Sequence, residues 1–134
     1  MIAVDASLVV DALTDDGPVG DAAQAELAAD PYWAAPEHLR VEATSAIRGR
    51  WLAGKITAER ADAAVRTLNR FAVRYASWDE LADRVWELRH NVTPYDAAYL
   101  ALAEARGCRL VTTDGKLRDC PGLRCEVGVV APAS

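Results

Sequence analysis

Four acidic residues, far apart in the 134-residue sequence, are of the type and placement that could do chemistry together: Asp5, Glu42, Asp96 and Asp114. Asp5 and Asp114 each follow a short apolar run of the kind that forms a buried strand. Carboxylates crowded at one point repel one another, and a divalent cation relieves that repulsion. Because Mg²⁺ prefers oxygen ligands and keeps several of its waters, such a group would hold Mg²⁺, or Mn²⁺ in its place.

Each acid also has an ordinary structural explanation. Asp is frequent at helix N-caps and in turns, which is the simplest interpretation of Asp5, Asp96 or Asp114 taken alone. Glu42 lies within a predicted helix, where charged residues normally face solvent. Its immediate neighbours are apolar, however, and this favours a carboxylate beside a hydrophobic face, where it needs a cation or a hydrogen-bond partner. The other acids of the predicted helices, Asp11 among them, are expected on solvated faces.

The elements that must position these acids alternate between strands and helices. We predict strands over 2–4, 32–35, 109–112 and 124–130, and helices over 8–13, 19–29, 36–53, 58–71, 78–89 and 94–106. This alternation predicts an α/β sandwich with a mainly parallel central sheet flanked by helices, and the length suits one domain over 1–134. Ligands bind at the carboxyl ends of strands in such sheets, which is where Asp5 and Asp114 fall.

Composition narrows the class of protein. Hydrophobic residues make up 51% and charged residues 26%, as in folded soluble domains, and no run approaches the roughly 18 to 20 apolar residues of a membrane span. With no signal-peptide pattern at the start, we expect a cytoplasmic protein. The net charge of −5 argues against binding nucleic acid by bulk electrostatics. Cys108, Cys120 and Cys125 fit neither a CxxC pair nor a metal-ligand set with His38 or His90, and we expect free thiols.

Other chemistries fit poorly. The sequence has no glycine-rich phosphate loop followed by Lys, and neither His stands beside a Ser or Cys nucleophile motif. An Asp-x-Asp phosphatase would have a second carboxylate where Ser7 stands. A phosphorylated receiver domain needs a late partner lysine, and Lys116 follows Asp114 too closely for that role.

Four fragments in order, spread over nearly the whole chain, carry a resemblance to a known family. They are Val4–Ser7, Ala35–Ala43, Thr93–Ala103 and Thr112–Asp114. With these fragments the chain resembles the PIN-domain ribonucleases, and among them the VapC-type toxins of bacterial toxin–antitoxin pairs. The resemblance implies a PIN-like three-layer sandwich and a Mg²⁺-dependent endoribonuclease that hydrolyses RNA phosphodiester bonds.

The resemblance also assigns roles at the acidic positions. Asp5 and Asp96 would be direct metal ligands, Asp114 would share the metal, and Glu42 would orient the attacking water. The polar positions beside the acids are expected to orient ligands or contact phosphate, and these map to Ser7 and Thr113.

Partners follow from the same comparison. RNA is the expected substrate, and Arg40, Arg48 and Arg50 could contact its backbone or simply be surface charge. A small antitoxin would cover the acidic groove, and apolar helix faces bearing Trp51, Trp78 or Trp86 could serve that contact or self-association into a homodimer or larger assembly with the antitoxin. We expect at least one of these tryptophans to pack in the core instead. An alternative function is a non-catalytic regulatory domain whose acidic pocket binds metal or a partner.

Overall fold

The computed structural model describes residues 1–130, in which five strands form one fully parallel sheet. The strands are β1 (Ile2–Val4), β2 (Trp33–Pro36), β3 (Val73–Ala76), β4 (Leu110–Thr112) and β5 (Val127–Val129), in the spatial order β3-β2-β1-β4-β5. The helices are α1 (Ala6–Thr14), α2 (Pro18–Ala29), α3 (Leu39–Leu52), α4 (Ala58–Arg70), α5 (Trp78–Glu87) and α6 (Pro94–Arg106), with a 3₁₀ turn η1 (Gly115–Leu117). The predicted α/β class with a parallel sheet is confirmed.

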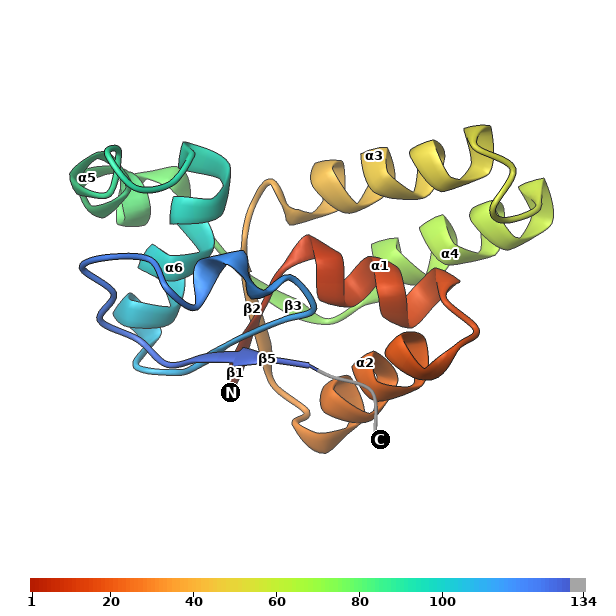
Figure 1. The fold of residues 1–134 in the computed structure, drawn as a ribbon, viewed down its shortest axis with the longest axis horizontal. Helices are drawn as coiled ribbons and strands as arrows, with labels where there is room; N and C mark the ends of the chain where they lie inside the picture. Colours follow the sequence, from red (N-terminus) through yellow and green to blue (C-terminus); the bar gives the residue numbers. More distant parts are fainter. Residues whose placement is uncertain (131–134) are drawn as a thin grey trace.

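The helices lie in two layers with the sheet between them (Figure 1). On one side α1 contacts α2, α3 and α4, and on the other side α6 packs against the central strands with α5 beyond it. The α3–α4 pair extends away from the sheet as an antiparallel hairpin, at the upper right of Figure 1. This arrangement is the expected three-layer sandwich. No helix within residues 1–130 is both long and apolar enough to cross a membrane.

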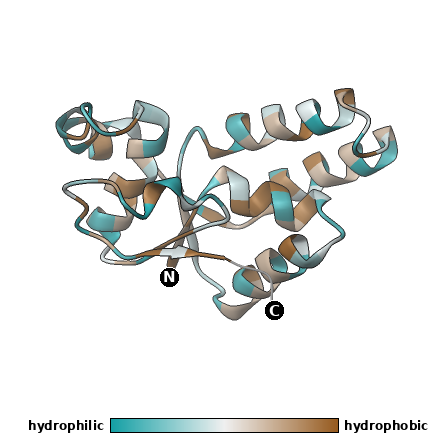
Figure 2. Ribbon diagram, viewed as in Figure 1, coloured by the Kyte–Doolittle hydropathy of each residue, from teal (hydrophilic) through white to brown (hydrophobic). Residues whose placement is uncertain are grey.

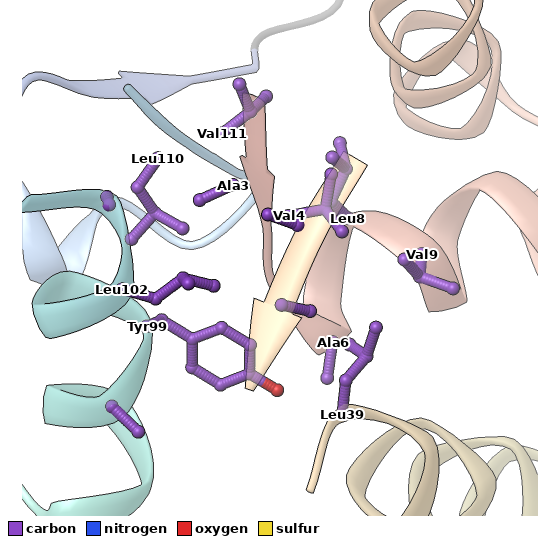
Figure 3. Close-up of a cluster of buried hydrophobic side chains, with 14 of the residues drawn as sticks. Ala3, Val4, Ala6, Leu8, Val9, Leu39, Tyr99, Leu102, Leu110 and Val111 are labelled. Carbon is purple, nitrogen blue, oxygen red and sulfur yellow. The ribbon is translucent and has the colours of Figure 1, made fainter. Parts of the chain in front are cut away.

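The core forms where the central strands meet α1 and α6. Hydrophobic residues fill the strands and much of α1, whereas hydrophilic turns interrupt α3 and α4 (Figure 2). Every residue of β1 is buried, because helices cover both faces of a parallel sheet. In Figure 3, Tyr99 reaches from α6 into this core, with its hydroxyl on the side where Ala6 and Leu39 lie. The Tyr99 hydroxyl is therefore a polar group of the core that lies at the carboxyl edge of the sheet.

Two differences from the sequence prediction concern β2 and β3. Pro36 was expected in the first turn of a helix, but it ends β2, where it pairs in register with Ala76 of β3, and α3 begins only at Leu39. β3 was not predicted at all. Its pairing with β2 extends the sheet to an edge, and this tertiary contact overrides the local preference of Pro for a helix start.

Candidate active site

Asp5 is the most deeply buried of the four acids, with 7% of its surface exposed. It is the N-cap of α1, because its Oδ1 accepts hydrogen bonds from the Leu8 amide at 3.0 Å and from the Ser7 hydroxyl at 2.8 Å. Its Oδ2 accepts a short hydrogen bond from the Thr112 hydroxyl at the end of β4. Burial raises the pKa of the Asp5 carboxyl, and these hydrogen bonds only partly offset that effect. Asp5 is thus both a cap and a carboxylate that a nearby cation would stabilise.

A chain of hydroxyl groups joins Asp5 to Asp114. Ser7 Oγ lies 3.1 Å from Thr112 Oγ1 and accepts a hydrogen bond from the Thr113 amide at 3.2 Å. Thr112 Oγ1 in turn accepts a hydrogen bond from the Asp114 amide at 3.0 Å. Thr112 is fully buried and holds Asp5, a contact that the sequence analysis did not anticipate. Its only sequence signal was a polar residue closing an apolar strand.

Glu42 lies in the first turn of α3 and faces Tyr99 and His38. Tyr99, which is 1% exposed, donates its hydroxyl hydrogen to Glu42 Oε2 over a long 3.5 Å. Glu42 Oε1 lies 3.1 Å from His38 Nε2, yet this shielded oxygen accepts no well-aligned hydrogen bond within residues 1–130. The pairing with Glu42 is the largest cause of the raised pKa of His38. His38 is the N-cap residue of α3, and its contact with Glu42 in the site was not predicted from the sequence.

The Tyr99 side chain is buried, and its hydroxyl lies beside the Glu42 carboxylate. Burial is the main reason that its pKa rises far above the ordinary value, and the negative charges of Glu42, Asp5 and Asp96 each raise it further. Of these three carboxylates, Glu42 is the one that contacts the hydroxyl, and Asp96 lies one helical turn before Tyr99 on α6.

Asp96 and Asp114 both form an ion pair with the same side chain, Lys116. Asp96 lies in the first turn of α6. Thr93 caps this helix, because its Oγ1 accepts a hydrogen bond from the Asp96 amide at 3.3 Å. Asp114 caps η1 in the same way, because its Oδ1 accepts a hydrogen bond from the Lys116 amide at 3.1 Å. The Lys116 ammonium lies 3.2 Å from Asp96 Oδ2 and 3.5 Å from Asp114 Oδ2. The hydrogen bond to Asp96 is the leading cause of the raised pKa of Lys116.

The chemistry of these donors suits a hard divalent cation. Within residues 1–130, no three acidic, histidine or cysteine side chains lie close enough together to ligate one metal ion as they stand. Lys116 already places one positive charge between two of the carboxylates, and Glu42 Oε1 is a buried acceptor without a good partner. Carboxylate oxygens are the ligands that Mg²⁺ prefers, so the donor types suit such an ion, although the spacing of the side chains here does not form a complete ligand set.

Comparison with known proteins agrees with this geometry. The sequence pattern of the PIN domain matches residues 2–123. The chain belongs to the PIN-domain family. Ribonuclease VapC1 of Mycobacterium tuberculosis is 40% identical over 128 residues, covering 95% of this chain and 96% of that protein. The expected relationship to VapC ribonucleases is therefore confirmed.

Solved structures show the same fold at lower identity. VapC20 of Mycobacterium tuberculosis, a sarcin–ricin-loop-cleaving toxin, superimposes with a TM-score of 0.66 at 21% identity and covers 86% of this chain and 91% of its own. VapBC2 from Rickettsia felis, solved with a DNA fragment from its promoter, gives a TM-score of 0.67 at 16% identity and covers 95% of this chain and 98% of its own. Both are structural relatives of this PIN domain.

The prediction that Asp11 is solvent-exposed was wrong. Asp11 is 9% exposed on α1, and its two oxygens accept hydrogen bonds from Arg50 at 2.6 Å and from Thr113 Oγ1 at 2.7 Å. Arg50 also donates to Thr14 Oγ1 at 2.7 Å. Arg50 and Thr113 therefore tie α3 and the end of β4 to α1 in this PIN domain, behind the four acids.

The other singled-out residues lie outside the acidic group. Arg40 is exposed, with its guanidinium 4.6 Å from the centre of the Tyr75 ring, and Arg48 is exposed beside the groove between α3 and α4. Trp51 lines that same groove. Trp51, Trp78 and Trp86 are all exposed, so the prediction that at least one of them packs in the core was wrong. The three cysteines are free thiols as expected.

Proposed function

We propose that this PIN domain hydrolyses RNA phosphodiester bonds with the help of Mg²⁺ and acts as the toxin of a toxin–antitoxin pair. The observation that supports this most is the set of contacts that connects three of the four acids and places the fourth beside the helix of one of them. Thr112 links Asp5 to the Asp114 backbone, and Lys116 links Asp114 to Asp96. Glu42 accepts a hydrogen bond from Tyr99, which stands on the same helix as Asp96. A chain with net charge −5 concentrates negative charge here, where a metal ion would reverse its sign.

The residues divide into ligands, a water-orienting group and positioning groups. In this proposal Asp5, Asp96 and Asp114 hold Mg²⁺, with Mn²⁺ as a possible substitute. When bound, the ion would supply an activated water molecule and neutralise charge on the scissile phosphate. Glu42 Oε1 would accept a hydrogen bond from the attacking water and take its proton once the His38 ring turns aside.

The hydroxyl groups and arginines have supporting roles. Ser7 and Thr112 hold the Asp5 carboxylate in one orientation. Asp5 would therefore lose less conformational entropy when it binds the metal ion. Thr113 acts through Asp11 rather than by touching substrate. Arg40 and Arg48 project from the helix that carries Glu42, and there they can contact the RNA backbone.

The antitoxin belongs to the same proposal. VapBC2 from Rickettsia felis is a structural relative. The groove between α3 and α4 is mostly apolar, with Ile47, Trp51 and Val65 in its lining. An amphipathic segment of a small antitoxin would bury these side chains and leave a basic portion to cover the acids.

The test is cleavage of total cellular RNA by purified protein with Mg²⁺, with Mn²⁺ and with EDTA. We expect cleavage at discrete sites that requires metal and is lost in Asp96→Asn and Glu42→Gln. Glu59→Gln removes an exposed acid on α4 and should keep full activity. Folded wild-type protein that binds Mn²⁺ but cleaves no RNA would contradict the proposal and favour the non-catalytic regulatory domain.

A further inference from the structure

A cavity of about 570 Å³ opens directly beside the acidic group. Its walls come from the segment between α5 and α6 and from η1, and they are formed by Arg89, His90, Asn91, Val92, Thr93, Pro94, Asp96, Lys116 and Leu117. Its volume lies within the range of roughly 300 to 1,000 Å³ that is typical of small-ligand sites. It can therefore hold a group the size of one nucleotide next to Asp96.

The charge of the lining points to an anionic ligand. Asp96 is the only acid in the lining, whereas Arg89 and Lys116 are full cations and His90 is a third basic group. Such a concentration of basic residues is unexpected in a chain of net charge −5. The lining contains no Trp, Tyr or Phe, which leaves the His90 ring and the Arg89 guanidinium as its groups on which a base could stack. Its two full cations suit the phosphates of a nucleic acid backbone.

The cation of Arg89 is held in place before any ligand arrives. Its Nη1 donates to the Trp86 carbonyl oxygen at 2.9 Å, and its guanidinium lies 4.7 Å from the centre of the Trp86 ring. The following turn is closed by hydrogen bonds from the Asn91 and Val92 amides to the Leu88 carbonyl. A wall that is already ordered loses less entropy when it binds a ligand.

Lys116 connects the cavity to the acids. Its side chain is 61% exposed, and its ammonium sits between Asp96 and Asp114 while its stem lines the cavity. A divalent ion at these carboxylates would repel the ammonium. The adjoining space is the cavity, where the ammonium would then meet a phosphate.

We propose that this cavity is the subsite for the RNA backbone next to the scissile phosphate, with Arg89 and Lys116 as its two charged contacts. The inference rests on the proposed ribonuclease function and names where the substrate strand runs. The strand passes from the acids across η1 toward the start of α6 and contacts these two cations through its phosphates.

The test is the salt dependence of RNA binding, measured in the Glu42→Gln background so that the RNA stays intact. The probe is a short fluorescein-labelled single-stranded RNA of mixed sequence, and its Kd is determined by anisotropy over a series of KCl concentrations with Mg²⁺ present. Arg89→Gln and Lys116→Gln are compared with Arg66→Gln, which removes an exposed charge from α4. Each phosphate contact with single-stranded RNA contributes about 0.7 to the slope of log K against log salt.

We expect Arg89→Gln and Lys116→Gln each to reduce the magnitude of that slope by about 0.7. Arg66→Gln should leave the slope unchanged. With Glu42 intact, Arg89→Gln should raise KM and preserve kcat. An Arg89→Gln slope equal to that of Arg66→Gln would overturn the subsite. Because the slope is a binding measurement, this failure differs from failure of the proposed function, in which wild-type protein would not cleave RNA at all.

Discussion

Replacing Lys116 with Gln should tighten the binding of Mn²⁺, because in the proposed site the lysine ammonium competes with the metal ion for the same carboxylates. The ammonium lies 3.2 Å from Asp96 Oδ2 and 3.5 Å from Asp114 Oδ2, but the side chain is 61% exposed. Exposed ion pairs contribute about 0.2 to 1 kcal/mol each, so the two together are worth about 1 kcal/mol. Loss of this competitor should therefore lower the Kd for Mn²⁺ about fivefold.

Isothermal titration of the protein with Mn²⁺ measures this directly, and the chain contains its own control. Lys55 is the only other lysine, and it is exposed in the turn between α3 and α4. Lys55→Gln removes the same charge from the whole molecule without touching the acids, so its Kd should match that of the wild type. If Lys116→Gln left the Kd unchanged or weakened Mn²⁺ binding, the ammonium would not be a competitor and Asp96 and Asp114 would not be the ligands.

Three further predictions concern stability. Arg50→Met should lower the free energy of unfolding in urea by about 2 to 3 kcal/mol, because it leaves the Asp11 carboxylate buried without its ion pair. The raised pKa of His38 means that its contribution to stability is complete below its unfolded pKa of about 6.5 and is lost as pH rises through the folded value. Wild type should thus exceed His38→Gln in stability at pH 5 and lose that advantage at alkaline pH, and equal differences at both ends would contradict the pairing. Gly20→Ala should destabilise by about 1 to 3 kcal/mol, since its Cβ would lie 1.8 Å from a backbone carbonyl oxygen, while Gly49→Ala, whose Cβ meets nothing within 4 Å, should stabilise by about 0.5 to 1 kcal/mol.

The sequence predicted the helices and four of the strands because periodic apolar residues and caps are local signals. Thr57 and Thr93 cap α4 and α6, and Gly107 ends α6 in the left-handed conformation. β3 was missed although Val73 and Tyr75 alternate with polar residues, because the run is short and its strand state depends on pairing with β2. Strand edges are fixed by contacts that a local pattern does not contain.

The candidate site shows the same division between local and distant information. The four acids were found because each stands at an element boundary or inside a motif of the PIN-domain family. Asp11 and Thr112 were missed because their hydrogen-bond partners lie far away in the sequence. His38 was missed because its contact with Glu42 depends on the direction in which the start of α3 points. Burial of a polar residue on α1 could be inferred only once α3 and the end of β4 were known to close over it.

The distribution of charge explains how a chain of net charge −5 can be proposed to bind RNA. Several arginines are already neutralised by acids within the chain, among them Arg50, Arg60, Arg84, Arg106 and Arg109. These pairs hold elements together, and their charges are already compensated within the chain. Binding must then depend on basic side chains that have no acidic partner within residues 1–130, such as Arg89, and on Lys116 once a metal ion displaces it. The local field beside the acids therefore decides whether RNA is bound, while the total charge sets only the long-range repulsion that salt screens.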